Sequence, residues 1–166
     1  MDLYCFDPSI KNLGFAHFKK TRTKPNWTLV KSRLIKSPGD SIGNWIDRLD
    51  WMVTQCYEAI PSPMKCNDVV AIELPDYRTE AASNSGALEK LVAFVFSLRA
   101  RMSPVARVVL VPVRKWKGNL PKEITQRRVA KRWNWQGTDH NEADAVGIGD
   151  WLIQNSANME FGGLVV

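Results

Sequence analysis

The sequence has few cysteines and no long apolar run, and each shortage excludes a class of protein. Cys5, Cys56 and Cys66 form no CxxC pair, so neither a disulfide framework nor a structural zinc site is expected. No uninterrupted apolar stretch approaches the roughly 20 residues that a membrane span needs. The N-terminus also lacks the basic and apolar segments of a secretory signal. We therefore expect a cytoplasmic protein with free thiols and no membrane partner.

Acidic residues are scarce between positions 99 and 132. That window holds eleven Lys or Arg residues and a single acid, Glu123, so it carries +10, while the rest of the chain carries −4. A basic block beside an acidic body is typical of a polyanion-binding face. The alternative is an ordinary solvated helix face, but such a face normally mixes charges of both signs.

The remaining composition is that of a folded protein. The chain has 166 residues, 45% of them hydrophobic, and seven tryptophans, which argues against disorder. This length is most simply one domain, spanning residues 1–166, with a core of its own.

The hydrophobic pattern predicts an α/β fold. Three strands at short intervals (2–7, 13–19 and 27–35) indicate an antiparallel meander. A helix capped by Asp40 or Ser41 and ended by Pro61 follows, and then two buried strands (68–74 and 105–113) alternate with a helix over 83–102. Further helices are expected over 121–133 and 141–154. We expect a mixed five-stranded sheet, the meander plus two parallel strands, flanked by helices. This order by itself fits several families.

Three acids stand in apolar surroundings. Asp7 ends the first strand, Glu73 lies near the end of VVAIEL, and Asp144 lies in an apolar helix segment. An Asp before Pro8 is ordinarily a turn former, but carboxylates are rarely buried unless they are paired or bound to a metal. A crossover would place the strand of Glu73 parallel to the first strand, with both acids at one edge of the sheet. Together the three acids would select Mg²⁺ or Mn²⁺.

The segment before Asp144 offers further candidate ligands. His140 and Asn141 precede Asp144 by four and three residues, so both can share its helix face. Either could complete a second metal position or orient the attacking water. Asp139 is expected to cap the helix rather than to bind metal, and Glu142 is expected to point elsewhere.

Four segments, taken in order, resemble a known family. They are FDPSIKNLGFA, VVAIELP, VPVRKWKGNLPKEITQRRV and DHNEADAVGIGDWL, and with the stretches between them they span nearly the whole chain. The chain resembles the RuvC-like Holliday junction resolvases of the RNase H/retroviral-integrase superfamily, nearest to the phage-type members. Residues 40–63 match only in helical character.

The resemblance implies a site that holds two Mg²⁺ ions, with Mn²⁺ as a substitute, on Asp7, Glu73 and Asp144. The family usually has a fourth ligand, Asp or His, three residues before the last Asp. Here Asn141 stands at that position and His140 one place earlier, and both stay candidates.

The resemblance also implies which residues meet DNA. Lys122 matches a lysine placed near the scissile phosphate, with a surface helix residue as the alternative. Tyr77 lies where the family presents an aromatic side chain to the junction centre, and Trp116 could pack in the core or stack on a base. Phosphate contacts are expected from basic residues around Lys122, namely Lys115, Lys117, Arg127 and Arg128.

The activity implied is that of a crossover junction endodeoxyribonuclease in DNA recombination and repair, acting in the cytoplasm of a bacterium or of a phage-infected host. Such an enzyme is a homodimer that makes two symmetric nicks with 5′-phosphate and 3′-hydroxyl ends. The alternatives are another RNase H-fold nuclease, acting on RNA–DNA hybrid or flap DNA, and a non-catalytic branched-DNA-binding module. Loss of an acid would favour the last, and all three acids are present.

Overall fold

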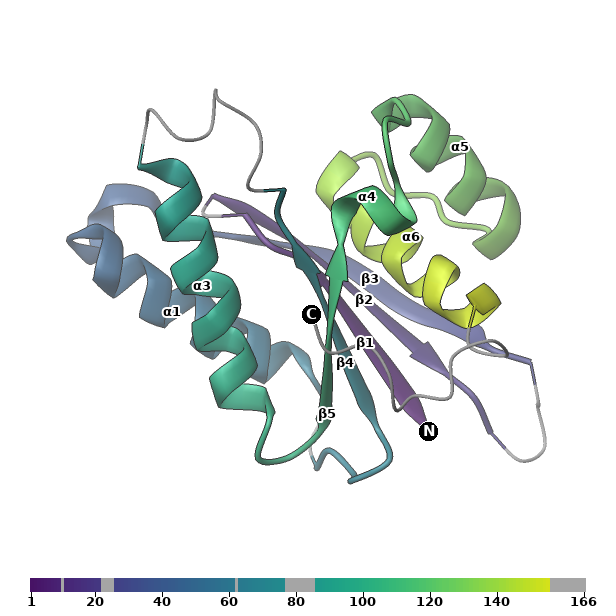
Figure 1. The fold of residues 1–166 in the computed structure, drawn as a ribbon, viewed down its shortest axis with the longest axis horizontal. Helices are drawn as coiled ribbons and strands as arrows, with labels where there is room; N and C mark the ends of the chain where they lie inside the picture. The colour runs from purple at the N-terminus through teal and green to yellow at the C-terminus, as the bar shows by residue number, and fades with distance from the viewer. Residues whose placement is uncertain (10, 22–25, 62, 77–85, 156–166) are drawn as a thin grey trace.

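A five-stranded mixed sheet forms the centre of the molecule (Figure 1). The computed structural model describes residues 1–9, 11–21, 26–61, 63–76 and 86–155. The strand order is β3-β2-β1-β4-β5; β1 pairs antiparallel with β2 and parallel with β4, and β4 pairs parallel with β5. This confirms the expected meander joined to two parallel strands. The strands are β1 (Asp2–Asp7), β2 (Asn12–Lys19), β3 (Thr28–Lys36), β4 (Val69–Leu74) and β5 (Arg107–Pro112).

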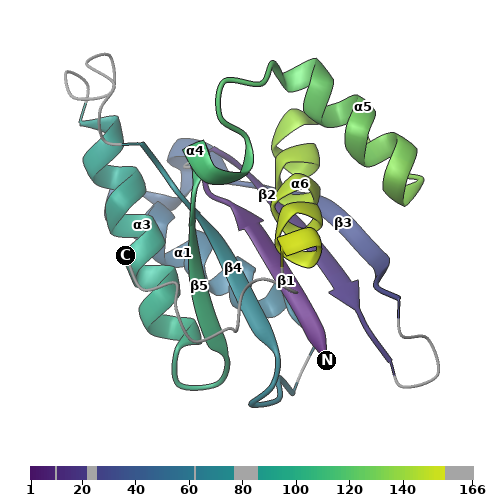
Figure 2. The same cartoon turned by 45° about the vertical axis from the view of Figure 1, so that its right-hand side comes forward.

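Helices cover both faces of the sheet (Figures 1 and 2). On one face lie α1 (Trp45–Ala59) and α3 (Ala87–Met102). On the other lies α6 (His140–Asn155), which packs on β1 and β2, with α5 (Lys122–Trp133) outside it and the short α4 (Val113–Trp116) at the end of β5. None of the helices in these described ranges combines the length and the apolar character that a bilayer-crossing segment needs.

The start of α1 differs from the sequence prediction. A 3-10 turn, η1 (Gly39–Ile42), precedes α1, and Asn44 caps that helix in place of Asp40 or Ser41. The Asn44 side chain accepts hydrogen bonds from the backbone of Ile46 and Asp47, and Asp47 accepts one from the backbone of Asn44, which is a capping box.

The end of β5 also departs from the prediction. Residues 113–116, the first of which was expected at the end of a strand, form α4. The expected start of the helix at 83 lies outside the described residues.

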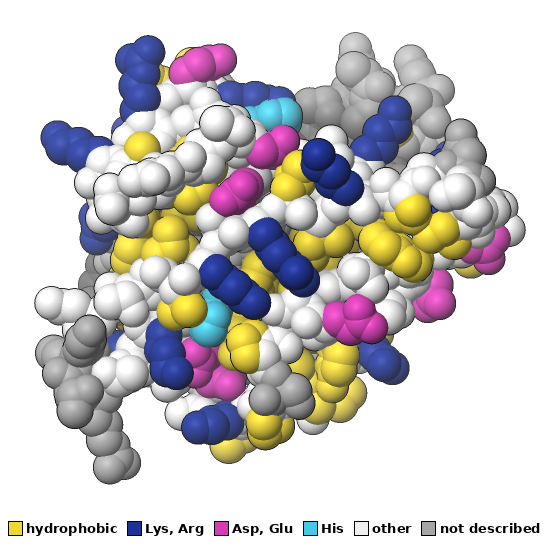
Figure 3. Space-filling model, turned by 180° about the vertical axis from the view of Figure 1, so that it is seen from behind, with side chains coloured by type: hydrophobic (Ala, Val, Ile, Leu, Met, Phe, Trp, Pro, Cys, Tyr) yellow, Lys and Arg dark blue, Asp and Glu magenta, His cyan; other side chains and the backbone are white. Residues whose placement is uncertain are grey.

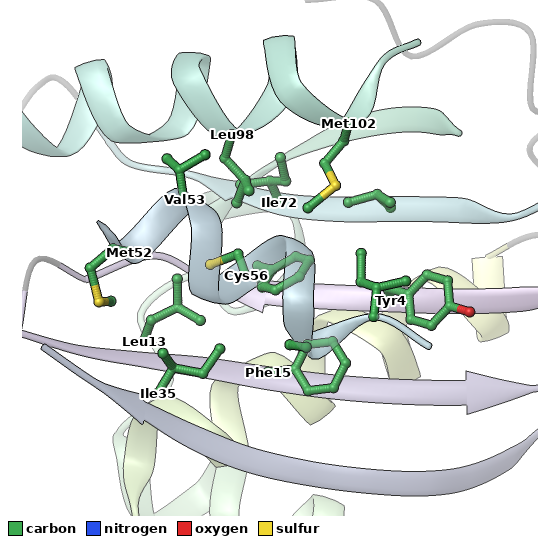
Figure 4. Packing of buried hydrophobic residues seen from close by; sticks show 14 of the residues in the cluster. Tyr4, Leu13, Phe15, Ile35, Met52, Val53, Cys56, Ile72, Leu98 and Met102 are labelled. Carbon is green, nitrogen blue, oxygen red and sulfur yellow. The ribbon is translucent and has the colours of Figure 1, made fainter. Parts of the chain in front are cut away.

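The core between the sheet and the α1/α3 layer is large and apolar (Figure 4). Alternate residues of the strands face this layer, as the two-residue period of a strand requires. Phe6, Phe15 and Leu98 are fully buried, and each contributes about 1.5–3 kcal/mol relative to an exposed side chain. The close-up shows α1 and α3 meeting the strands through Tyr4, Leu13, Phe15, Ile35, Met52, Val53, Cys56, Ile72, Leu98 and Met102.

The α6 side of the sheet is built from smaller residues, so the helix lies close to the strands. Leu3, Cys5, Val69 and Ala71 belong to this core. A Cβ atom on Gly14 of β2 would overlap the backbone carbonyl of Asn141 at the start of α6. The α6 backbone therefore rests directly on β2, next to the end of β1, because Gly14 pairs with Asp7.

Two basic side chains of the edge strand β3 lie over the ring of Phe15 on the neighbouring strand β2. Lys31 and Arg33 place their cations 5.6 and 5.9 Å from the centre of the Phe15 ring. Figure 3 shows the molecule from behind, where Lys and Arg side chains lie between patches of hydrophobic side chains. Charged residues of this kind discourage an edge strand from pairing with another molecule.

Gly14→Ala should loosen the contact between α6 and β2. The added methyl group has no space beside Asn141, and overpacking of this kind costs about 1–3 kcal/mol. We expect a lower free energy of unfolding, measured by urea denaturation. A variant as stable as the wild type would contradict the close approach of helix and strand.

Candidate active site

Asp7 and Glu73 occupy matching positions on neighbouring parallel strands. Phe6 of β1 pairs with Ile72 of β4, so the next residue on each strand is an acid. Side chains two residues apart share a face, and Cys5 and Ala71 both belong to the core under α6. Asp7 and Glu73 therefore point to the α6 side at one edge of the sheet. The predicted placement of both acids on adjacent parallel strands is confirmed.

Asp144 comes to the same edge from the first turns of α6. Asp139 begins the helix, and its side chain accepts a hydrogen bond of 2.8 Å from the backbone of Asn141, so the predicted cap is confirmed. Asp144 is 6% exposed and Asp7 is 7% exposed. Glu142 points away from them, to Ser32 on β3 and to Trp135, as expected from the sequence.

Burial raises the pKa of all three acids. Burial raises the pKa of Asp7 well above its usual value, and the charges of Glu73 and Asp144 raise it further. Burial likewise raises the pKa of Glu73 to about 7, although hydrogen bonds from Trp116 and with Asp7 lower it. The pKa of Asp144 is raised by burial, against the opposing effect of Lys117. Enclosed carboxylates of this kind favour a bound cation.

Lys117 supplies a cation inside the site. Its Nζ atom contacts Oδ2 of Asp144, and its side chain is only 12% exposed. Its charge also lowers the pKa of Asp7 and of Glu73. The sequence predicted a lysine facing the DNA backbone here, whereas the structure places the ammonium against the acids.

The donor set suits Mg²⁺. Oδ1 of Asp144 is buried and has no hydrogen-bond partner among the described residues, so it is open to a cation. Carboxylate oxygens are the ligands that Mg²⁺ prefers. In the described ranges, no three His, Cys, Asp or Glu side chains already converge as a finished metal site. A metal ion at these acids would therefore draw them together and shift the Lys117 ammonium.

Trp116 is a functional contact that the sequence analysis missed. Its Nε1 donates a hydrogen bond of 2.8 Å to Oε2 of Glu73. The ring lies over Gly147 of α6, where a Cβ atom would come within 2.6 Å of it, and beside Thr125 of α5. Gly147 therefore allows the indole to reach Glu73. The one available signal was that Trp116 lies within the basic KWKG segment.

His140 and Asn141 differ in what they contact. Asn141 donates a hydrogen bond of 2.7 Å from its side-chain amide to the carbonyl of Asn12, which ties α6 to β2. The charge of His140 lowers the pKa of Asp144, so the imidazole lies close enough to act on the site.

The other basic residues lie around this edge. Lys122 is exposed at the start of α5, and its charge lowers the pKa of Asp7 and of Asp144. Lys115, Arg127 and Arg128 are exposed. A cavity of about 160 Å³ between α4, α5 and α6 has Trp116, Lys117 and Arg128 in its wall. Tyr77 lies outside the described residues.

The metal-free protein should lose stability as the pH rises. Because the pKa of Glu73 is about 7 in the folded chain against 4.5 for a free side chain, the folded state binds more protons between these values. Its free energy of unfolding should therefore fall by about 1–3 kcal/mol from pH 4.5 to pH 7. The raised pKa values of Asp7 and Asp144 act in the same direction.

Urea unfolding in EDTA at a series of pH values measures this slope. Glu73→Gln should flatten it and should make the protein more stable at neutral pH. Glu58→Gln, on the exposed side of α1, is the matched control and should leave the slope in place. A slope that is equally steep in Glu73→Gln would contradict the assignment.

Comparison with solved structures identifies the fold. Neither a protein-family model nor a curated protein sequence matches this chain. The structure of Thermus thermophilus RuvC in complex with a Holliday junction is similar over 95% of this chain and 96% of that one, with 17% identity and a TM-score of 0.64.

Two further resolvases have the same architecture. The fowlpox virus Holliday junction resolvase matches over 93% of this chain and 99% of its own, with 14% identity and a TM-score of 0.54. The yeast mitochondrial resolvase Ydc2 matches over 96% and 80%, with 12% identity and a TM-score of 0.61. The chain therefore has the fold of the RuvC-like Holliday junction resolvases, as its sequence motifs predicted.

Proposed function

We propose that this protein is a metal-dependent endonuclease that resolves four-way DNA junctions by paired symmetric nicks. The observation that carries the proposal is the meeting of Asp7, Glu73 and Asp144 at one edge of the sheet. The fold supports it, because similar structures include a RuvC and a fowlpox resolvase with junction DNA. The whole chain, residues 1–166, would form one nuclease domain.

The three acids would hold two Mg²⁺ ions, one on Asp7 and Asp144 and one on Asp7 and Glu73, and Mn²⁺ would substitute. When bound, these ions activate water and stabilise the leaving oxygen of a phosphodiester, giving 5′-phosphate and 3′-hydroxyl ends. Trp116 fixes the orientation of Glu73 through its hydrogen bond.

The basic residues would bind the junction. Lys122, exposed and near the acids, is suited to pair with the scissile phosphate and to offset negative charge in the transition state. Lys115, Arg127 and Arg128 would contact flanking phosphates, which add affinity without sequence information. Tyr77 stays a candidate for stacking at the junction centre.

A homodimer would supply the two active sites that paired nicks require, and its two-fold axis would match that of the junction. The outer side of α3 is our candidate contact, because Phe96 is 45% exposed there. Val95 of the same helix is fully buried in the core.

Cleavage of labelled substrates in Mg²⁺ tests the proposal. We expect cutting of a four-way junction but not of linear duplex, splayed DNA or an RNA–DNA hybrid, and no cutting in EDTA. Asp144→Asn should lose about 100-fold or more, since metal-ion catalysis supplies several kcal/mol. Preferred cutting of the hybrid or of splayed DNA would favour another nuclease of this fold. Tight junction binding without cutting would favour a binding module.

The alanine variants of His140 and Asn141 should differ in their effects on cleavage rate and on stability. We expect His140→Ala to lower the cleavage rate with little change in stability, because the charge of His140 lowers the pKa of Asp144. Asn141→Ala should lower the free energy of unfolding by about 1 kcal/mol, because it loses the bond to Asn12. Urea unfolding and single-turnover cleavage of both variants measure the two effects. The reverse pattern would make Asn141 the fourth ligand.

A further inference from the structure

Lys117 is held in an unusual position for a lysine in a basic segment. Long basic side chains normally extend their charged end into water, whereas this ammonium turns inward to Asp144. The backbone around it is fixed: Lys117 and Gly118 both donate to the carbonyl of Val113, and Leu120 donates to the carbonyl of Lys117. The Nζ atom also lies 5.4 Å from the centre of the Trp116 ring. These contacts define where the ammonium lies.

The charge balance of the site depends on this lysine. Burial opposes ionisation of all three acids, and repulsion from neighbouring acids adds to it at Asp7 and Glu73. Among the ion pairs in the described ranges, the pair between Lys117 and Asp144 is the one that involves any of these acids. Lys122 acts on Asp7 and Asp144 from an exposed position, where water weakens its effect.

The two oxygens of Asp144 have different environments. Oδ2 contacts the Lys117 ammonium, while Oδ1 is buried without a partner. An ion that uses both oxygens, or that brings Asp144 toward Asp7, has to take the place of the ammonium. For such an ion, the lysine is a direct competitor at Oδ2 of Asp144.

We propose that Lys117 is a built-in counter-ion, which holds the acids together without metal and is released toward the substrate phosphate when a divalent ion binds. The inference rests on the proposed function of the acids as a metal site and describes the regulation of that site. Because coupling between two binding events is reciprocal, the factor by which a bound metal weakens the contact of Lys117 with Asp144 is also the factor by which that contact weakens metal binding. A phosphate that attracts the freed ammonium would in turn favour metal binding, so DNA would promote loading of the site.

The test compares Lys117→Met with the wild type, using Lys131→Met, an exposed lysine of α5, as the matched control. In EDTA, Lys117→Met should melt roughly 10 °C lower, because it leaves enclosed charges without a partner. Its affinity for Mn²⁺, measured by calorimetry, should rise about tenfold or more because the competitor is gone. Adding Asp144→Asn to Lys117→Met should recover most of the lost melting temperature. Lys131→Met should change neither quantity.

A second measurement uses the unmodified protein, so it does not depend on the folding of a variant. Acetylation by an N-hydroxysuccinimide ester, read by mass spectrometry, should modify Lys117 slowly in EDTA and several times faster with saturating Ca²⁺. Lys131 should react at one rate throughout.

Equal reactivity of Lys117 in EDTA and Ca²⁺, or an unchanged Mn²⁺ affinity in Lys117→Met, would overturn the inference and leave the proposed function intact. The proposed function fails separately, if the wild type binds no divalent ion and cuts no junction.

Discussion

Burial of three carboxylates, Asp7, Glu73 and Asp144, near one edge of the sheet is the constraint on which the rest of this site depends. Two of these acids are less than a tenth exposed, and burial opposes the charge of all three. Such a cluster is stable only if the surrounding structure fixes the positions of the acids and a cation offsets their negative charge. The parallel pairing of β1 with β4 fixes two acids, and the close contact of α6 with Gly14 fixes the third.

Three residues around the acids help to stabilise these buried carboxylates. Trp116 donates to Glu73, Lys117 contacts Asp144, and Lys122 adds positive charge from outside. All three belong to the segment between β5 and the first turn of α5, which carries much of the excess positive charge of the chain. One segment therefore stabilises the acids, and under the proposed function the same residues would also present cations to a phosphate backbone.

The sequence predicted the positions of those site residues that lie in regular strands, or at the start of a regular helix. The alternation of β1 and β4 puts Asp7 and Glu73 on one face, and the parallel crossover puts them at one edge, so both could be predicted. The capping role of Asp139 follows from its place before the helix. The inward turn of Lys117 and the bond from Trp116 to Glu73 could not be predicted, because they depend on a short irregular segment. Asn44 was missed as a cap because η1 shifts the start of α1.

Asn141 and His140 stand where the sequence offered two candidates for one further ligand. Asn141 uses its amide to join α6 to β2, while the charge of the neighbouring His140 lowers the pKa of Asp144. The two residues therefore have different surroundings, although they are adjacent in the chain. The solved resolvases share 12–17% identity with this chain, and what they have in common with it is the fold.

Anomalous diffraction from crystals grown with Mn²⁺ tests the central claim most directly. The account predicts manganese peaks between Asp7 and Asp144 and between Asp7 and Glu73, with Nζ of Lys117 moved away from Asp144. Crystals that bind manganese elsewhere, or that keep Lys117 on Asp144 at saturating Mn²⁺, would contradict it.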